Sequence, residues 1–169
     1  MTFQKGLHLI ISHWQRIPPE SVDSTVKNYH WLDMVMGLFE AYDRGGETVV
    51  VVDANGNLVE GPGFNVFAVN GSTLTTPGQG VLEGMTRRTT IELAPEYGYE
   101  VVQRNLPADE ALAADEVFIT TTAGGLIPIT KIDEQTIGAG APGPVTRKLQ
   151  NRYWEVHEDP RYTSKIDYK

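Results

Sequence analysis

One lysine stands where the sequence could produce a reactive amine. Lys27 lies between a loop that contains Pro18 and Pro19 and an amphipathic helix, with Tyr29 and Trp31 close behind it. Aromatic neighbours can desolvate an ammonium group, which lowers its pKa and yields a free amine that attacks carbonyl carbons. Taken alone, such a lysine is usually a solvated surface side chain. The hypothesis of a nucleophile therefore depends on other motifs.

A carboxylate and two turns supply the other groups that such chemistry needs. Glu60 ends a strand, and two of the next three residues are glycines, which permit a close backbone approach to a bulky group. A glycine also precedes the helix that opens at Met85, so the amides of Met85 and Thr86 are free to hold a phosphate. The small-residue turn 120–125 offers hydroxyls and amides as a second anion contact. Singly, these features also fit a solvent-facing glutamate and a helix cap. Together, an amine, a carboxylate and two phosphate-suited turns are the groups that hold pyridoxal phosphate.

Further motifs stand in register with these groups. They are Val26-Lys27-Asn28 with Trp31, Phe39-Glu40-Ala41-Tyr42-Asp43-Arg44-Gly45, Thr121-Thr122-Ala123-Gly124-Gly125 and Gly143-Pro144-Val145-Thr146. In this order the chain resembles the C-terminal half of the class IV, or fold type IV, pyridoxal-phosphate aminotransferases, the family of branched-chain and D-amino acid aminotransferases. The resemblance spans nearly all of residues 7 to 168, and it looks most like the (R)-selective amine transaminases.

The resemblance implies a role for each group. Lys27 would bind the cofactor covalently and then carry a proton between the substrate's α-carbon and the cofactor. Glu60 would pair with the pyridinium nitrogen and keep the ring protonated, which maintains the cofactor as an electron sink. The other cofactor-binding residues implied are Leu82 on one face of the ring, the amides of Met85 and Thr86 at the phosphate, and the hydroxyl of Thr122. The residues implied to border the substrate are Trp31, Thr121 and Ala123.

The implied activity is that of a transaminase, which moves an amino group from an amine or amino acid to a 2-oxo acid. Members of the family are longer, form homodimers, and have an N-terminal domain that supplies an arginine to the phosphate and much of the substrate pocket. We therefore expect residues 1–169 to form a single domain equivalent to the C-terminal cofactor-binding domain, with the N-terminal domain absent. Leu32 stands where branched-chain enzymes have a tyrosine, so branched-chain specificity is less secure than transaminase chemistry.

Two alternatives remain open. A lyase of the same fold, such as an aminodeoxychorismate lyase, uses the same lysine and glutamate on another substrate, although the segment from Gly143 to Tyr168 resembles amine transaminases. An inactive, truncated remnant that only binds cofactor, or that misassembles because its domain interface is exposed, would carry the same residues.

The elements that must position these groups follow from periodicity. Strands are expected over Leu7–Trp14, Thr48–Val52, Leu58–Glu60, Phe64–Val69, Thr73–Thr75, Tyr99–Arg104, Glu116–Thr120 and Leu126–Ile132. Helices are expected over Tyr29–Arg44, Thr86–Tyr97, Ala108–Ala114 and Pro144–Glu158. The apolar face of the first helix comprises Leu32, Val35, Met36, Phe39 and Tyr42, and the last helix buries Val145, Leu149, Tyr153 and Val156. We predict an α+β domain of the D-amino acid aminotransferase-like fold, with a barrel-like, antiparallel-rich sheet flanked by helices.

Composition restricts the class of partner. With 40% hydrophobic and 21% charged residues, the chain is an ordinary globular domain. The net charge of −8 repels nucleic acid and anionic membranes, which favours a small-molecule partner. The sequence has no cysteine, and its four histidines have no pair at metal-ligand spacing, so no metal site is predicted. No apolar run is long enough to span a bilayer and the first six residues contain no apolar signal core, so we expect a cytoplasmic protein.

Overall fold

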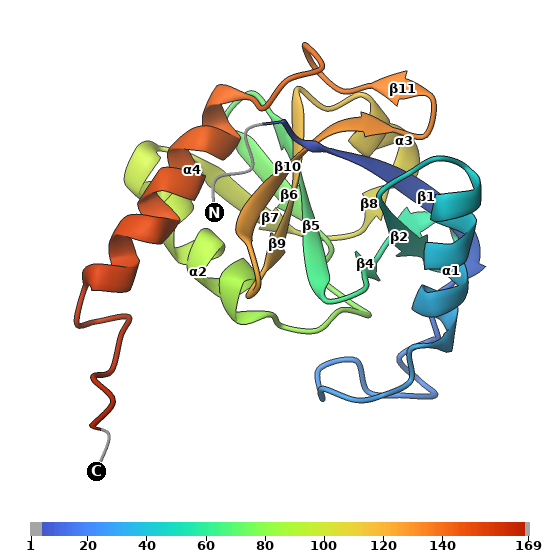
Figure 1. The fold of residues 1–169 in the computed structure, drawn as a ribbon, viewed down its shortest axis with the longest axis horizontal. Helices are drawn as coiled ribbons and strands as arrows, with labels where there is room; N and C mark the ends of the chain where they lie inside the picture. Colours follow the sequence, from blue (N-terminus) through green and yellow to red (C-terminus); the bar gives the residue numbers. More distant parts are fainter. Residues whose placement is uncertain (1–4, 168–169) are drawn as a thin grey trace.

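An 11-stranded mixed sheet organises the chain in the computed structural model, which describes residues 5–167 (Figure 1). The strands are β1 (Leu7–Gln15), β2 (Thr48–Val52), β3 (Asn57–Leu58), β4 (Glu60–Gly61), β5 (Phe64–Asn70), β6 (Thr73–Thr76), β7 (Glu100–Gln103), β8 (Leu106–Pro107), β9 (Glu116–Thr121), β10 (Gly125–Ile132) and β11 (Gln135–Thr136). The helices are α1 (Leu32–Asp43), α2 (Met85–Leu93), α3 (Ala108–Leu112) and α4 (Pro144–Glu155), with 3-10 turns η1 (Ala94–Tyr97) and η2 (Val156–Glu158). Residues 1–4, which begin the segment without a signal core, and Tyr168, which ends the family resemblance, lie outside the described residues.

A short segment of the chain closes part of the sheet on itself. The strand order is β7-β6-β5-β9-β10-β1-β2-β3-β8, with β4 beside β5 and β11 beside β10. Leu58 pairs with Val52 of β2, and two residues later Glu60 pairs with Asn65 of β5. Segment 57–61 therefore connects the β2 side of the sheet to the β5 side, and the strands between them curl into a barrel-like layer. The predicted α+β class with a barrel-like sheet and flanking helices is confirmed. The parallel pairing of β1 with both β10 and β2 was not anticipated.

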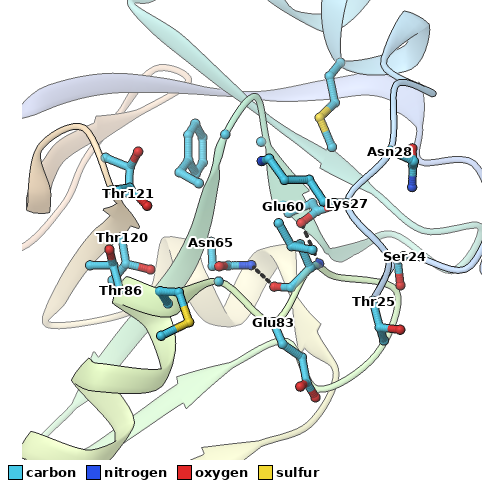
Figure 2. A pocket seen from close by; sticks show the side chains of 18 of the residues that line it. Ser24, Thr25, Lys27, Asn28, Glu60, Asn65, Glu83, Thr86, Thr120 and Thr121 are labelled. Atoms are coloured by element: carbon cyan, nitrogen blue, oxygen red, sulfur yellow. Dashed lines mark hydrogen bonds between the residues drawn. The ribbon is translucent and has the colours of Figure 1, made fainter. Parts of the chain in front are cut away.

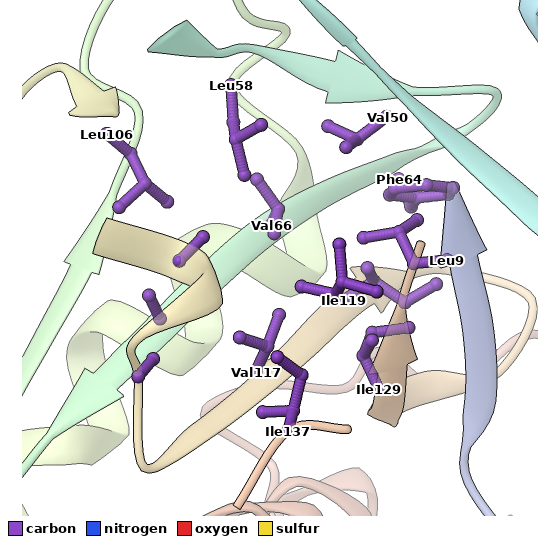
Figure 3. Close-up of a cluster of buried hydrophobic side chains, with 14 of the residues drawn as sticks. Leu9, Val50, Leu58, Phe64, Val66, Leu106, Val117, Ile119, Ile129 and Ile137 are labelled. Carbon is purple, nitrogen blue, oxygen red and sulfur yellow. The ribbon is translucent and has the colours of Figure 1, made fainter. Parts of the chain in front are cut away.

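Both faces of the central strands are buried, which explains their nearly continuous apolar sequence. In β5, Val66 and Ala68 point into the first hydrophobic cluster, whereas Phe67 and Val69 point into the second. The first cluster fills the inside of the curled sheet and contains Leu9, Val50, Leu58, Phe64, Ile119 and Ile129 (Figure 3). The second cluster lies between the sheet and the helices α2 and α4 and contains Phe118, Leu126, Leu149 and Tyr153.

Phe67→Ala is expected to lower the free energy of unfolding by about 3–5 kcal/mol, because it removes a ring from a closely packed interior. The Phe67 ring is fully buried and stacks on Phe118 with their centroids 4.9 Å apart. Urea denaturation followed by circular dichroism measures the change. Phe39→Ala is the matched control, because its side chain is 58% exposed and its removal should change stability by less than about 0.5 kcal/mol. Equal losses in the two variants would contradict this placement of the core.

The direction in which α1 faces differs from the prediction. The helix begins at Leu32 rather than Tyr29, and the side packed on the sheet carries Met34, Gly37 and Ala41. Most of the face that was predicted to be apolar is exposed, namely Leu32, Val35, Phe39 and Tyr42, while Met36 is half-buried. Two charged residues of α1, Asp33 and Glu40, lie half-buried beside this side, because β1 and the residue after it supply their partners. The Ser12 hydroxyl donates to Glu40 Oε2 over 2.7 Å. The small residues in turn allow α1 to approach the sheet closely.

The remaining helices follow the sequence closely. Pro95 converts the end of the predicted second helix into η1, and Gly98 ends it with a φ of 79°, a left-handed conformation that favours glycine. In α4 and η2 the four apolar residues expected to be buried are buried. The carboxylate of Glu116 accepts the amides of Val145 and Thr146, each over 2.8 Å, and so caps the start of α4. Among residues 5–167, every helix is too short or too polar to cross a bilayer.

Candidate functional site

A cavity of about 360 Å³ opens at one end of the curled sheet, in the size range of small-molecule sites. Of the site residues predicted from the sequence, eight line it: Lys27, Trp31, Glu60, Leu82, Met85, Thr86, Thr121 and Thr122. Ala123 is exposed and is not among the lining residues. Figure 2 shows Lys27 and Glu60 on one side of the cavity, Thr86, Thr120 and Thr121 on the other, and Asn65 between them. Segments distant in the sequence thus meet around one space.

Lys27 reaches the cavity from the loop between β1 and α1. Its side chain is exposed, and the neighbouring Tyr29 is 99% exposed. Tyr29 therefore does not desolvate this lysine as expected, because both side chains are open to solvent, whereas Trp31 lines the same cavity as Lys27. The turn before the lysine is held locally, since Asp23 accepts hydrogen bonds from the amide and the hydroxyl of Thr25. The amine remains accessible to a ligand in the cavity.

Glu60 is the buried carboxylate of the site and is only 5% exposed. Its Oε1 accepts from Arg16 Nε over 3.2 Å, and its Oε2 accepts from the Leu82 amide over 2.9 Å. Burial raises the pKa of Glu60, and the hydrogen bond from Leu82 and the charge of Arg16 offset part of that rise. A carboxylate has about four lone-pair positions, so Glu60 retains room for a further donor from the cavity.

The segment before α2 is fixed from two sides. The Asn65 side-chain amide donates to the Leu82 carbonyl over 2.9 Å, while the Leu82 amide donates to Glu60 (Figure 2). No side chain caps α2, and its first backbone bond runs from Arg88 to Gly84. A Cβ at position 84 would collide with Asn65 Oδ1, so glycine permits this close approach. In the described part of the chain the first amides of α2 are left without acceptors, an arrangement that binds anions.

Hydroxyl groups complete the side of the cavity opposite Lys27. Thr120 is buried, lines the cavity, and its Oγ1 has no hydrogen-bond partner among residues 5–167. Buried polar groups are normally satisfied, so an orphaned hydroxyl in a cavity indicates a site for a polar ligand. An accessible amine, a buried carboxylate, free helix amides and hydroxyls together suit a phosphorylated heteroaromatic aldehyde. Residues 5–167 include no group of three or more His, Asp or Glu side chains that could hold a metal ion.

Two polar lining residues that hold predicted site residues in place, Arg16 and Asn65, were not predicted as site residues from the sequence. Arg16 stands in no motif, and its burial arises only because three distant segments converge on it, so no local signal identifies it. Asn65 had a usable signal, because a polar residue inside an apolar strand is informative when that strand is buried on both faces.

Comparison with known proteins identifies relatives of this arrangement. The model of the amino-transferase class IV family matches residues 2–132. The chain is 36% identical to the branched-chain-amino-acid aminotransferase of Pseudomonas aeruginosa over 80% of its own length and 45% of that protein. It is 34% identical to a putative branched-chain-amino-acid aminotransferase of Methanocaldococcus jannaschii over 90% of this chain and 54% of that protein.

Solved structures agree. A branched-chain amino acid aminotransferase from Thermobaculum terrenum in its PLP form superimposes with a TM-score of 0.88 at 36% identity, covering 94% of this chain and 54% of that one. The branched-chain aminotransferase of the thermophilic archaeon Thermoproteus uzoniensis, solved with norvaline, gives 0.86 at 31% identity, over 94% and 54% of the two chains. The chain thus spans about half the length of the curated relatives it matches.

Proposed function

This chain belongs to the amino-transferase class IV family, and from that premise we propose that it is the cofactor-binding part of a pyridoxal-phosphate-dependent transaminase. The observation that carries the proposal is the convergence of Lys27, Glu60 and the free amides of α2 on one cavity. Each matches a different group of the cofactor: the aldehyde, the ring nitrogen and the phosphate. We propose further that residues 1–169 correspond to the C-terminal domain of the family.

The proposed role of each residue follows from its position in the cavity. When bound, pyridoxal phosphate supplies an electron sink for the carbanion left by proton removal. Lys27 would hold the aldehyde covalently and, when free, would take and return the substrate's α-proton at its Nζ. Glu60 would hold a proton on the ring nitrogen through a charge-assisted hydrogen bond in a buried setting. Leu82, whose backbone is held by Glu60 and Asn65, would pack against the ring.

The phosphate end is assigned to uncharged groups. The amides of Met85 and Thr86 lie at the positive end of the α2 dipole and would donate to the phosphate oxygens. Thr120 and Thr122 also line the cavity, and the hydroxyl of Thr120, which has no hydrogen-bond partner within the described residues, would be available to donate. Thr121 and Trp31 remain as the lining residues assigned to the substrate, whereas Ala123 lies beyond the cavity lining in this chain.

The proposed reaction moves an amino group between an amine or amino acid and a 2-oxo acid. The branched-chain aminotransferases among the relatives support an amino acid donor. Leu32 is 74% exposed and is not among the cavity-lining residues, and branched-chain specificity stays less secure than transaminase chemistry. The (R)-selective amine transaminase likeness, the homodimer and the cytoplasmic location stay as predictions.

Covalent trapping tests the proposal. The purified chain is mixed with pyridoxal phosphate, its visible absorption spectrum is recorded, and borohydride reduction is followed by peptide mass analysis. We expect a visible band and a single reduced adduct on Lys27, because Lys27 is the lysine that lines the cavity. Pyridoxal, which lacks the phosphate, is the matched control ligand and should label Lys27 much less at the same concentration. No adduct, or one spread evenly over the other lysines, would refute a preserved cofactor site.

A further inference from the structure

Arg16 is buried at the centre of the site, although it belongs to no sequence motif. It follows β1, its backbone amide donates to Val52 over 2.8 Å, and only 6% of its side chain is exposed. Its Nε donates to Glu60, and its Nη1 donates to Asp33 Oδ2 over 2.8 Å and to the carbonyl of His30 over 3.0 Å. One planar guanidinium thus binds the Glu60 strand, the end of the Lys27 loop and the start of α1.

The loop that carries Lys27 has few other hydrogen bonds to the rest of the described chain. Within residues 18–30, the hydrogen bonds of the described chain join near neighbours in the sequence, such as Val26 to Asp23 and Asn28 to Val26. The exception is the bond from Arg16 to the carbonyl of His30. Asp33 reinforces it from the helix side, since its Oδ2 also accepts the Ile17 amide over 2.9 Å. Removing Arg16 would leave residues 18–30 without a hydrogen bond to a distant part of the described chain.

The charges around Arg16 also favour a cationic ligand atom beside Glu60. Two carboxylates, Asp33 and Glu60, share one guanidinium, so the buried group carries a formal charge of −1. Buried charges are costly unless they are paired. A protonated ring nitrogen paired with Glu60 would neutralise this charge of −1. Loss of Arg16 would instead leave two carboxylates in close proximity.

We propose that Arg16 is a positioning residue that holds the Lys27 loop and Glu60 in fixed relation by binding both. The three side-chain hydrogen bonds of Arg16 join residues of this chain alone, so they do not depend on the proposed function. The effect of Arg16 on cofactor binding does rest on the proposed function. Lysine cannot reproduce them, since an ammonium group lacks the planar fork that reaches three acceptors. Arg16→Lys therefore keeps the positive charge but not the three hydrogen bonds. Arg16→Met removes both the charge and the hydrogen bonds while retaining bulk.

Hydrogen–deuterium exchange of the cofactor-free chain tests directly whether Arg16 holds the Lys27 loop in place. In Arg16→Met, amides of residues 20–31 should exchange at least about tenfold faster, as expected for loss of charged hydrogen bonds, while amides of β5 and β9 stay protected. Arg16→Lys should give an intermediate change, and it carries the test if Arg16→Met does not fold. Arg104→Met, which removes an exposed pair with Glu110, is the matched control and should leave the loop unchanged. Unchanged loop exchange in both Arg16 variants would overturn the proposal.

The consequence for the site is measured separately. At equal pyridoxal phosphate, borohydride trapping on Lys27 should be about tenfold slower in Arg16→Met than in the parent chain, with partial recovery in Arg16→Lys. If Arg16 had a purely structural role, its replacement would lower the urea midpoint without a change in amide exchange specific to the loop. If the parent chain traps no cofactor, the proposed function fails while the exchange result still decides the role of Arg16. Trapping at the parent rate in both variants would refute the positioning role.

Discussion

Lys27→Ala is expected to abolish borohydride-trapped pyridoxal phosphate and to slow amino-group transfer by about 10⁴-fold or more, because it removes both the covalent attachment and the base. The side chain is exposed, so the free energy of unfolding should change by less than about 0.5 kcal/mol. Peptide mass analysis after reduction measures the adduct. The absorbance of the cofactor, followed after addition of an amine donor, measures transfer in a single turnover.

The matched control for this variant is Lys131→Ala. Lys131 is a lysine of β10 that pairs with Glu134 and is not among the cavity-lining residues. Its removal should leave the adduct, its position and the transfer rate at parental values. An adduct that persists at full yield in Lys27→Ala would show that the reactive amine belongs to another residue, and the assignment of the cavity would fail with it.

Glu60→Gln is expected to retain the trapped adduct on Lys27 while slowing proton removal by about 10²–10³-fold, the usual cost of losing one preorganised electrostatic contact. The amide can still accept a hydrogen bond but carries no charge to hold a proton on the ring nitrogen. Rapid-mixing absorbance with an α-deuterated amine separates the proton step from binding, because only the former shows an isotope effect. A parental rate in this variant would exclude the ion pair.

The pH dependence of stability gives Glu60→Gln a second readout. Because burial raises the pKa of Glu60 above its ordinary value of 4.5, the folded state holds the carboxyl proton more tightly than the unfolded state does. The corresponding stability is present below the ordinary pKa and declines as pH rises through the raised one. Glutamine removes this decline, which urea titrations in mildly acidic buffer would measure. Glu110→Gln, whose carboxylate pairs with Arg104 outside the cavity, should not reproduce the effect.

Side-chain periodicity and turn residues predicted those parts of the structure that depend on residues close together in the sequence. Most strand positions and the buried face of α4 follow from side-chain periodicity, and the turn that frees the α2 amides follows from a single glycine. The face of α1 was assigned wrongly because hydrophobicity alone ignores partners: Asp33 and Glu40 turn inward to meet Arg16 and Ser12. Which residues share a cavity depends on strand pairing, and this is why Arg16 was missed.

The position of β1 has a consequence for how the chain is made. It lies far ahead of β10 in the sequence, yet it pairs along one edge with β10, where Leu7 lies opposite Ile129. During synthesis this apolar strand leaves the ribosome long before that partner exists, and an open strand edge is prone to pair with other chains. Contacts of such long sequence separation also slow folding. The curled sheet, and with it the cavity, can close only once β10 has emerged.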